Sequence, residues 1–292
     1  MLILRGDTII AAEAIMDVVV DGLTFPEAPR WRDGTLWFSD FYTQRVLTVD
    51  PRGTLETVVE VPQRPSGLGW TPDGALLIVS MLDRRLLRLD GGKLRVVADL
   101  SALATGPCND MVVDAVGRAY VGNFGFDRHR GEPPRTTCLA RVDPDGAIMR
   151  AADELSFPNG TVITPDGRTL IVAETLAHRL TAFDVAADGA LSNRRLFAAL
   201  DSCFPDGICL DAEGAVWVAD ARTPRVLRVL DGGRIERTIP TGARFAFACM
   251  LGGQDRRTLY LCTSTGSGPA MADKRDGAIE SVRVDVPGAG LP

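Results

Sequence analysis

The sequence FPNGTVITPDGRTLIVAE begins at Phe157, and a close variant of it, FPDGICLDAEGAVWVAD, begins at Phe204. Both segments open with Phe-Pro-polar-Gly. A glycine follows eight residues after the polar residue in each, counted from Asn159 in the first and from Asp206 in the second. The apolar residues that come next alternate in the manner of a half-buried β-strand. The repetition indicates a chain that is built from copies of one small β unit.

The same pattern of a turn followed by an alternating strand recurs along the whole chain. Its turn positions, which serve as markers, are Gly34, Gly74, Gly117, Gly167, Gly214 and Arg256. The spacings between them are 40, 43, 50, 47 and 42 residues. After each of the first five markers comes a second hairpin of the same kind, so one unit reads as four short strands. Such units at this spacing predict an all-β fold, a six-bladed β-propeller of four-stranded antiparallel blades.

The sixth unit is one strand short, because only IESVRVDV follows its long loop. We predict that the N-terminal segment MLILRGDTII supplies the missing outer strand and closes the ring. Closure is favoured because it removes exposed sheet edges. No Pro/Ser-rich linker divides the chain, so residues 1–292 are predicted to form a single domain.

The composition limits the class of protein and of partner. With 46% hydrophobic and 24% charged residues, the chain is typical of a globular protein. A net charge of -6 and a pI near 5.1 argue against nucleic acid or an anionic membrane as partner. The six cysteines form no CxxC pair, and no apolar run approaches the ~20 residues that span a bilayer. We therefore expect a cytoplasmic protein with reduced thiols that acts on a small molecule.

Counting back from the markers identifies a candidate metal site. Eight residues before each marker, or seven in the first unit, lies the start of the innermost strand, which borders the central channel of a propeller. These positions are Glu27, Ser66, Asn109, Asn159, Asp206 and Ala248. Four of them carry side-chain oxygen, as two carboxylates and two amides, and pseudo-symmetry should bring them together on one axis. Asn and Asp also begin turns by binding local backbone, but the shared register favours a common site.

Such an all-oxygen set suits one divalent cation. Ca²⁺ is favoured on ligand chemistry, with Mn²⁺, Mg²⁺, Fe²⁺ and Zn²⁺ as alternatives. Zinc ranks lower because it more often recruits histidine or cysteine. The predicted metal ligands are Glu27, Asn109, Asn159 and Asp206.

The chain resembles the senescence marker protein/gluconolactonase (regucalcin-like) family over nearly its whole length. The resemblance is carried by FPEAPRW, CNDMVVDAVG and the two segments quoted above. The resemblance implies a six-bladed propeller whose central divalent metal is held by Glu27, Asn159 and Asp206, with Asn109 near metal and substrate. It also implies that Asp206 is the base and that the substrates are sugar lactones. One departure is Pro107, which stands where sugar-lactone members carry a substrate-holding arginine. This weakens the case for an aldonolactone.

Two long loops, 123–137 and 263–277, are predicted on the same face as the metal site, together with the short loop that ends at His178. Loops of that length in a compact fold commonly bind substrate. We predict that Asn123, Arg128 and His178, together with Asn109, contact the substrate. Arg128 could grip an anionic group, although solvated loop charge is the alternative interpretation.

These observations predict a divalent-metal-dependent hydrolase that opens a small lactone, with Asp206 and Asn109 as catalytic residues. The cation would polarise the carbonyl, while Asp206 or a metal-bound water supplies the attacking oxygen. One alternative is an organophosphate or fluorophosphate triester hydrolase, because diisopropyl fluorophosphatase resembles this arrangement of one Glu, two Asn and one Asp. A second is a non-catalytic metal- or ligand-binding propeller, and a third is a pathway-specific ring opening or isomerisation.

Overall fold

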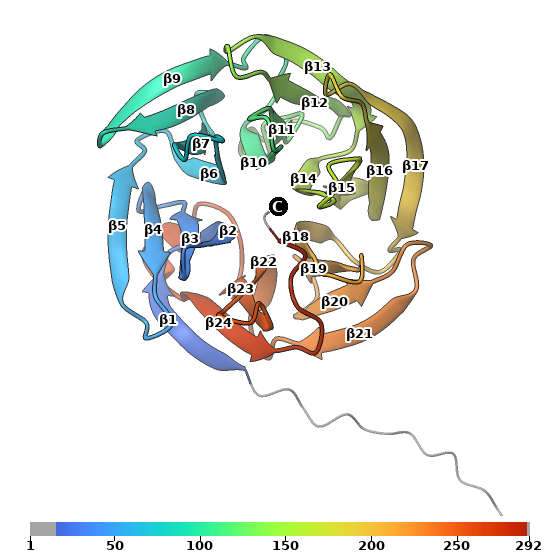
Figure 1. The fold of residues 1–292 in the computed structure, drawn as a ribbon. Helices are drawn as coiled ribbons and strands as arrows, with labels where there is room; N and C mark the ends of the chain where they lie inside the picture. Colours follow the sequence, from blue (N-terminus) through green and yellow to red (C-terminus); the bar gives the residue numbers. More distant parts are fainter. Residues whose placement is uncertain (1–15, 291–292) are drawn as a thin grey trace, which may run out of the picture.

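The computed structural model describes residues 16–290. They form six four-stranded antiparallel sheets arranged as blades around a central channel (Figure 1). The chain is therefore a six-bladed β-propeller, as its repeats predict. In each blade the innermost strand borders the channel and the outermost strand forms the rim.

The first three blades follow one another in chain order. Blade 1 consists of β2 (Pro26–Arg32), β3 (Thr35–Asp40), β4 (Arg45–Val49) and β5 (Leu55–Glu60). Blade 2 consists of β6 (Pro65–Trp70), β7 (Leu76–Ser80), β8 (Arg85–Asp90) and β9 (Lys93–Asp99). Blade 3 consists of β10 (Cys108–Val113), β11 (Ala119–Asn123), β12 (Thr137–Val142) and β13 (Ile148–Leu155).

The remaining three blades complete the circle. Blade 4 consists of β14 (Pro158–Ile163), β15 (Thr169–Glu174), β16 (Arg179–Val185) and β17 (Leu191–Ala199). Blade 5 consists of β18 (Pro205–Leu210), β19 (Val216–Asp220), β20 (Arg225–Val229) and β21 (Ile235–Pro240). Blade 6 consists of β22 (Phe245–Gly252), β23 (Thr258–Ser264), β24 (Gly277–Arg283) and, as its outer strand, β1 (Asp17–Leu23).

An N-terminal strand closes the ring, but it is not the predicted segment. β1 pairs antiparallel with β24, with Asp17 opposite Ser281. Residues 1–10, for which this role was predicted, lie outside the described residues. The place of β1 at the outer edge of blade 6 agrees with the connectivity of the chain, because β1 ends at Leu23 and β2 begins at Pro26. The chain thus passes directly from the outer edge of blade 6 to the inner edge of blade 1.

The repeated turn has one backbone conformation in all six blades. Each marker residue has a positive φ, between 56° and 94°, in the left-handed region that glycine adopts without steric cost. Five of these positions are glycine, and the sixth is Arg256. The strongest sequence signal of the repeat is therefore a conformational requirement of the turn that joins the first two strands of each blade.

Apolar side chains fill the interfaces between neighbouring blades. Val162 and Ile171 of blade 4, for example, pack in one cluster with Val218 and Leu227 of blade 5. All six cysteines are free and buried in this interior. Because close-packed interiors resist deformation, this packing fixes the relative positions of the inner strands.

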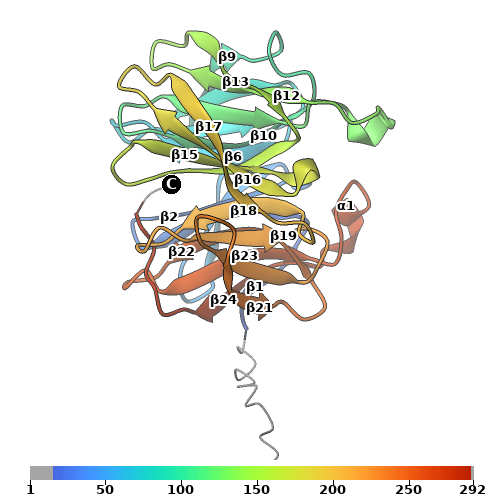
Figure 2. The same cartoon turned by 90° about the vertical axis from the view of Figure 1, so that its right-hand side faces the viewer.

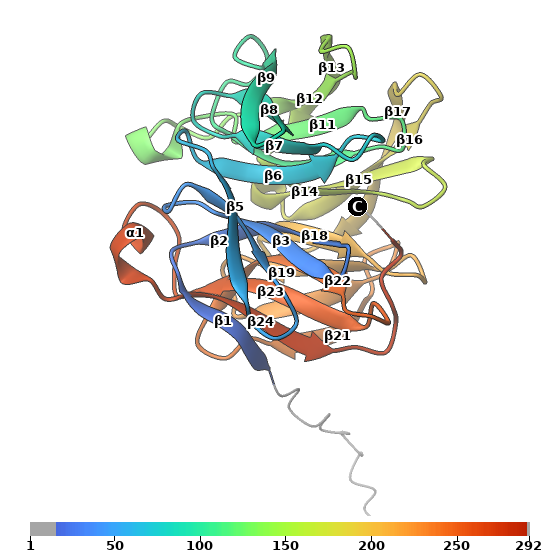
Figure 3. The ribbon, with the colours of Figure 1, turned by 60° about the vertical axis from the view of Figure 1, so that its left-hand side comes forward.

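The two long loops project from the same face of the ring (Figures 2 and 3). The first contains a short 3-10 helix at Arg128–Arg130, and the second contains α1 (Met271–Lys274). Another 3-10 turn, Thr175–Ala177, follows β15. The segment that follows β24 ends, within the described residues, on the opposite face. Within residues 16–290, no helix has the length and apolar character to cross a membrane.

Candidate metal centre and substrate cavity

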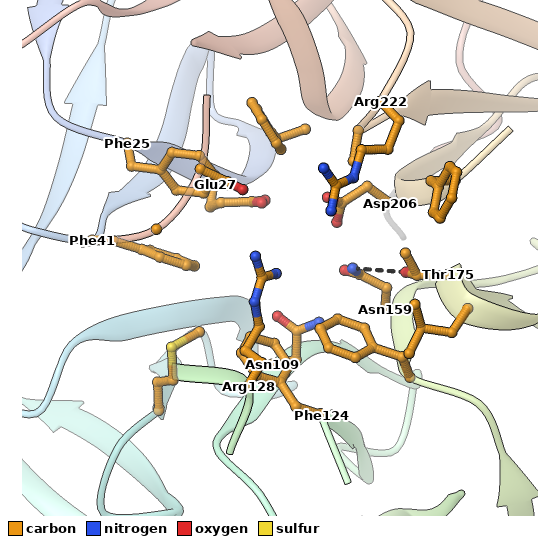
Figure 4. A pocket seen from close by; sticks show the side chains of 18 of the residues that line it. Phe25, Glu27, Phe41, Asn109, Phe124, Arg128, Asn159, Thr175, Asp206 and Arg222 are labelled. Carbon is orange, nitrogen blue, oxygen red and sulfur yellow. Dashed lines mark hydrogen bonds between the residues drawn. The ribbon is translucent and has the colours of Figure 1, made fainter. Parts of the chain in front are cut away.

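A cavity of about 240 Å³ opens on the face that carries the long loops. Its lining includes Glu27, Asn109, Asn159 and Asp206, which come from the inner strands of four different blades (Figure 4). The structure thus brings together the four oxygen-bearing residues that the repeat register selects. Ser66, which shares their register in blade 2, is not among the lining residues.

A break in the β-ladder accompanies each of these side chains. In blades 3, 4 and 5 the pairing of the inner strand with its neighbour shifts across Asn109, Asn159 and Asp206, and in blade 1 it shifts immediately after Glu27. Such bulges bend a strand and re-aim a side chain, and they are common beside binding sites. The same shift spans Ser66 in blade 2, which does not line the cavity, so the bulge is a shared feature of this register position and not sufficient by itself.

The blade 6 assignment needs a correction. The ladder shifts between Ala246 and Ala248, so the residue at the bulge is Phe247. Phe247 lines the cavity, whereas Ala248, the residue obtained by counting from the marker, does not. A slip of one residue reverses the face on which a side chain lies, and the count of eight was one residue too short in this blade.

The glycine of the Phe-Pro-polar-Gly motif lets adjacent inner strands approach closely. A Cβ atom on Gly160 would lie 2.5 Å from the backbone nitrogen of Ile208 and 2.7 Å from the carbonyl oxygen of Asp206. A Cβ atom on Gly207 would lie 2.5 Å from the Cβ of Ala248. Because these neighbours are backbone atoms or short side chains, only glycine fits directly after these two cavity residues.

A buried carboxylate at the end of the second strand holds the Phe-Pro segment in three blades. It accepts a hydrogen bond from a backbone N–H of one of the two residues before the proline. The pairs are Asp40 with Phe25 (2.7 Å), Glu174 with Ser156 (2.8 Å) and Asp220 with Phe204 (3.2 Å). These carboxylates therefore position the motif without facing the cavity themselves.

Asn123 occupies the equivalent position in blade 3, but its hydrogen bonds go to the first long loop and to β12. Its amide donates to the carbonyl of Cys138 at 2.9 Å, and its Oδ1 accepts from the Gly125 N–H at 3.0 Å and from the Thr137 hydroxyl at 2.8 Å. Asn123 is buried and does not line the cavity. The geometry does not support the predicted substrate contact, because these bonds direct the side chain into the base of its own loop.

His178 is also held away from the cavity. Its Nδ1 lies 2.8 Å from the carbonyl oxygen of Cys203, and the edge of its ring packs on Phe204 with centroids 4.3 Å apart. His178 is not a lining residue. Of the predicted substrate contacts, Asn109 and Arg128 lie in the cavity, and Asn123 and His178 do not.

The two carboxylates of the cavity are not paired directly with a positive side chain. Glu27 and Asp206 form no ion pair within residues 16–290, although their side chains are largely removed from solvent. Burial raises the pKa of Glu27 well above its usual value, and the nearby charge of Asp206 adds to the effect. Burial likewise raises the pKa of Asp206 to about 8, against the opposing influence of Arg128 and a hydrogen bond from Asn159. A divalent cation between the two carboxylates would remove this penalty.

The two amide side chains of the cavity also fit a cation site. Asn109 Nδ2 is buried without a hydrogen-bond partner. Asn159 Nδ2 donates to Thr175 Oγ1 at 3.2 Å, and Thr175 in turn donates to the carbonyl of Pro205 at 2.7 Å. This chain directs Asn159 Oδ1 toward the cavity (Figure 4). The sequence analysis did not single out Thr175 as a site residue. Its only signal in the sequence is that it directly follows the strand that becomes β15.

The donor set is therefore two carboxylates and two amide oxygens, a combination that suits a hard cation such as Ca²⁺. No group of three or more His, Cys, Asp or Glu side chains with metal-binding geometry occurs in the described part of the chain. A site for a softer metal such as zinc would normally draw on such a group.

A buried ion pair supports Asn109 from behind. Arg30 lies 2.8 Å from Asp110, the residue after Asn109, and also donates to the carbonyl of Met111 at 2.6 Å. Arg30 belongs to β2 and Asp110 to β10, so the pair joins blades 1 and 3 across the channel. Burial raises the pKa of Asp110, and the Arg30 guanidinium opposes that effect.

Phenylalanine side chains form most of the remaining wall, which we call the phenylalanine collar. It consists of Phe25, Phe41, Phe124, Phe126, Phe157, Phe204 and Phe247, seven of the eleven phenylalanines in the chain. The rings of Phe124 and Phe157 stack with centroids 4.4 Å apart. Phe25, Phe157 and Phe204 are the first residues of the three Phe-Pro motifs, so the signal was present in the sequence although no role was assigned to it.

Three arginines reach the cavity above the collar. They are Arg64, Arg128 and Arg222, and none forms an ion pair within the described residues. The Arg222 guanidinium lies 5.7 Å from the ring centre of Phe204, and that of Arg64 lies 4.7 Å from the ring centre of Tyr42. The side chains of Arg128 and Arg222 extend into the cavity (Figure 4).

Comparison with known proteins places this geometry in a family. The family model described as the SMP-30/Gluconolactonase/LRE-like region matches residues 25–265. The chain belongs to this family. The matched range contains all four oxygen-bearing residues of the cavity.

Two curated relatives and one solved structure illustrate the similarity to members of the SMP-30/gluconolactonase/LRE-like family. A 6-deoxy-6-sulfogluconolactonase of Pseudomonas putida is 28% identical over 96% of this chain and 98% of its own length. Regucalcin of Danio rerio is 28% identical over 82% of both chains. A gluconolactonase structure from Xanthomonas campestris has a TM-score of 0.75 and 25% identity, and covers 96% of this chain and 90% of its own.

The structure also shows what Pro107 does in this family member. Its carbonyl oxygen accepts a hydrogen bond from the Phe124 N–H at 2.9 Å, which ties the start of β10 to the first long loop. Pro107 does not line the cavity and offers no side-chain donor to a ligand.

Proposed function

We propose that the protein is a divalent-cation-dependent lactonase that opens a small lactone in this cavity. The observation that carries the proposal is the convergence of Glu27, Asn109, Asn159 and Asp206 from four blades, with two carboxylates whose pKa values are raised by burial and that form no ion pair within residues 16–290. The lactonases among the relatives support the reaction class. The six free, buried cysteines favour a reducing compartment, the cytoplasm.

The reaction adds one water to the lactone and releases a hydroxy acid. The water oxygen bonds to the carbonyl carbon, and the bond from that carbon to the ring oxygen breaks. One water proton goes to the ring oxygen as it leaves, and the other is released when the new carboxylic acid ionises. When bound, the cation would polarise the carbonyl and stabilise the negative charge that develops on its oxygen.

The side chains divide the remaining tasks. Glu27, Asn109, Asn159 and Asp206 would hold the cation through oxygen atoms. A carboxylate has two oxygens, so Asp206 can also accept a proton from the attacking water and pass it to the ring oxygen. Asn109, whose amide has no protein partner, is free to bind the substrate beside the cation.

A second candidate reaction is hydrolysis of an organophosphate or fluorophosphate triester. The apolar collar favours it, because such triesters are less polar than a sugar lactone. The same donor set would serve, with a phosphoryl oxygen in place of the lactone carbonyl. A non-catalytic binding propeller would hold the cation but turn over neither class.

The test is a panel of lactones and organophosphates, assayed with and without a chelator and after Ca²⁺ is restored. We expect chelator-sensitive lactone turnover, and a fall in kcat/KM of at least about a hundredfold for Asp206→Asn and for Glu27→Gln. Ser66→Ala is the matched control, because Ser66 has the same register but does not line the cavity. Full activity of both carboxylate variants would refute the mechanism.

A further inference from the structure

The wall of the cavity is poorly suited to a polyhydroxylated ligand. Among the side chains that the structure describes, the neutral polar ones in this wall, apart from the cation ligands, are those of Tyr42, Thr175 and Ser267. The Thr175 hydroxyl is already committed, since it accepts from Asn159 and donates to the carbonyl of Pro205. Few groups therefore remain to receive the hydroxyls of a sugar.

Each sugar hydroxyl that leaves water without a new partner weakens binding. An apolar ring gains instead, because the phenylalanine collar offers aromatic faces and edges on several sides. Phe25 and Phe247 pack in a tilted arrangement with ring centroids 4.7 Å apart, and Phe124 and Phe157 stack. Figure 4 shows Phe25, Phe41 and Phe124 around the cavity. The collar thus selects a ligand with a flat, apolar body.

The charges of the cavity point to a second property of the ligand. A divalent cation neutralises the two carboxylates, Glu27 and Asp206. The guanidinium groups of Arg64, Arg128 and Arg222 are then left as the net charge of the site, and no carboxylate of residues 16–290 pairs with them. Arg64 is half-buried, whereas Arg128 and Arg222 are exposed. Uncompensated positive charge that reaches into an apolar cavity favours an anionic ligand group.

We propose that the substrate is a lactone with an apolar, ring-shaped body that also carries a fixed carboxylate or other anionic group. The inference rests on the proposed lactonase function. The collar holds the body, the oxygen ligands face the lactone carbonyl, and Arg128 and Arg222 bind the anionic group. Arginine suits this role because its planar fork matches a carboxylate.

The replacement of a donor side chain by Pro107 agrees with this selectivity. The position is tied to the backbone of Phe124, a member of the collar, and contributes no donor to the cavity. Ring opening would turn the anionic lactone into a product with two carboxylates, with one water consumed and one proton released.

The experiment compares three lactones with the purified, Ca²⁺-loaded protein. They are gluconolactone, dihydrocoumarin, and a dihydrocoumarin that bears a carboxylate on its aromatic ring. We expect kcat/KM for the carboxylate-bearing compound to exceed that of dihydrocoumarin by at least about tenfold, as a charge-assisted hydrogen bond would give. Gluconolactone should be the poorest of the three.

Variants then test the arginines. Arg128→Met and Arg222→Met should each lower the ratio of kcat/KM for the charged and uncharged dihydrocoumarins by about tenfold. Arg130→Met is the matched control, because Arg130 lies in the same 3-10 turn but pairs with Asp127 at 3.4 Å and does not line the cavity. Its ratio should equal that of the unmodified protein. Unchanged ratios in both cavity variants would overturn the role of the arginines.

Two outcomes separate this inference from the proposed function. Chelator-sensitive turnover with gluconolactone as the best substrate would leave the lactonase proposal standing and overturn the substrate class. If no lactone is turned over, the lactonase proposal fails, and the proposed substrate class, which rests on it, fails with it.

Discussion

Replacing Gly160 by alanine should damage the candidate metal centre through the backbone alone. Gly160 follows Asn159 in β14, and the added Cβ would lie 2.5 Å from the nitrogen of Ile208 and 2.7 Å from the carbonyl oxygen of Asp206. Both atoms belong to the backbone of β18 and have no rotamer to change. The two inner strands must separate, and they carry two of the four proposed cation ligands.

The size of the effect follows from these distances. Ordinary contact begins at 3.4 Å, so an approach of 2.5 Å requires a shift of about 0.9 Å. Overpacking of this kind costs about 1–3 kcal/mol in the free energy of unfolding. Displacement of cation ligands should lower Ca²⁺ affinity by about 10–100-fold. A misplacement near 1 Å should also reduce turnover by about a hundredfold.

Urea unfolding, Ca²⁺ calorimetry and lactone turnover measure the three effects. Gly266→Ala is the matched control, because its Cβ would meet only Met271 at 3.5 Å and its φ lies outside the left-handed region. We expect the control to change the free energy of unfolding by less than about 1 kcal/mol. If Gly160→Ala had the stability and Ca²⁺ affinity of the unmodified protein, the close approach of β14 and β18 would be refuted.

Further predictions concern the surroundings of the cavity. Arg30→Met leaves the Asp110 carboxylate buried without its partner and should lower the free energy of unfolding in urea by about 3–5 kcal/mol. A loss below 1 kcal/mol would contradict this. Thr175→Val frees the amide of Asn159 and should lower Ca²⁺ affinity in calorimetry by about tenfold, with little change in Tm. Because burial raises the pKa of Asp206 to about 8 from 3.8, Ca²⁺ must displace a proton near neutral pH, so its affinity should rise with pH up to about 8. The raised pKa means that the folded cation-free protein binds more protons than the unfolded chain over this range, so it should lose stability as pH rises from 3.8 to about 8. Stability and Ca²⁺ affinity that are flat across this range would contradict the raised pKa.

Turn chemistry and register were readable in the sequence. The marker positions require a left-handed backbone, so they stand out as glycines, and strand periodicity carries the count from the marker to the cavity residue. The count succeeded for Asn159 and Asp206 because their blades contain the same number of residues between bulge and turn. It failed at Ala248 because the bulge of blade 6 is arranged differently, and bulges leave no reliable trace in a single sequence.

The direction in which a side chain points was the other property that the sequence could not predict. Asn123 and His178 were placed on the correct face by loop position, but hydrogen bonds to Cys138 and Cys203 direct them into the protein. Such bonds join residues that are 15 and 25 positions apart, and no local pattern reports them. The phenylalanine collar was missed for a similar reason, since Phe before Pro reads as core packing until the strand starts are seen to converge.

The pairing of β1 with β24 has a consequence for how the protein is made. Blade 6 combines an early segment of the chain with the last three strands. During synthesis on a ribosome the first five blades can each assemble from contiguous chain, while β1 must wait with an unpaired edge until β24 emerges. We expect the final step of maturation to be the meeting of these two strands, and a chaperone that shields β1 during translation would raise the yield of native rings.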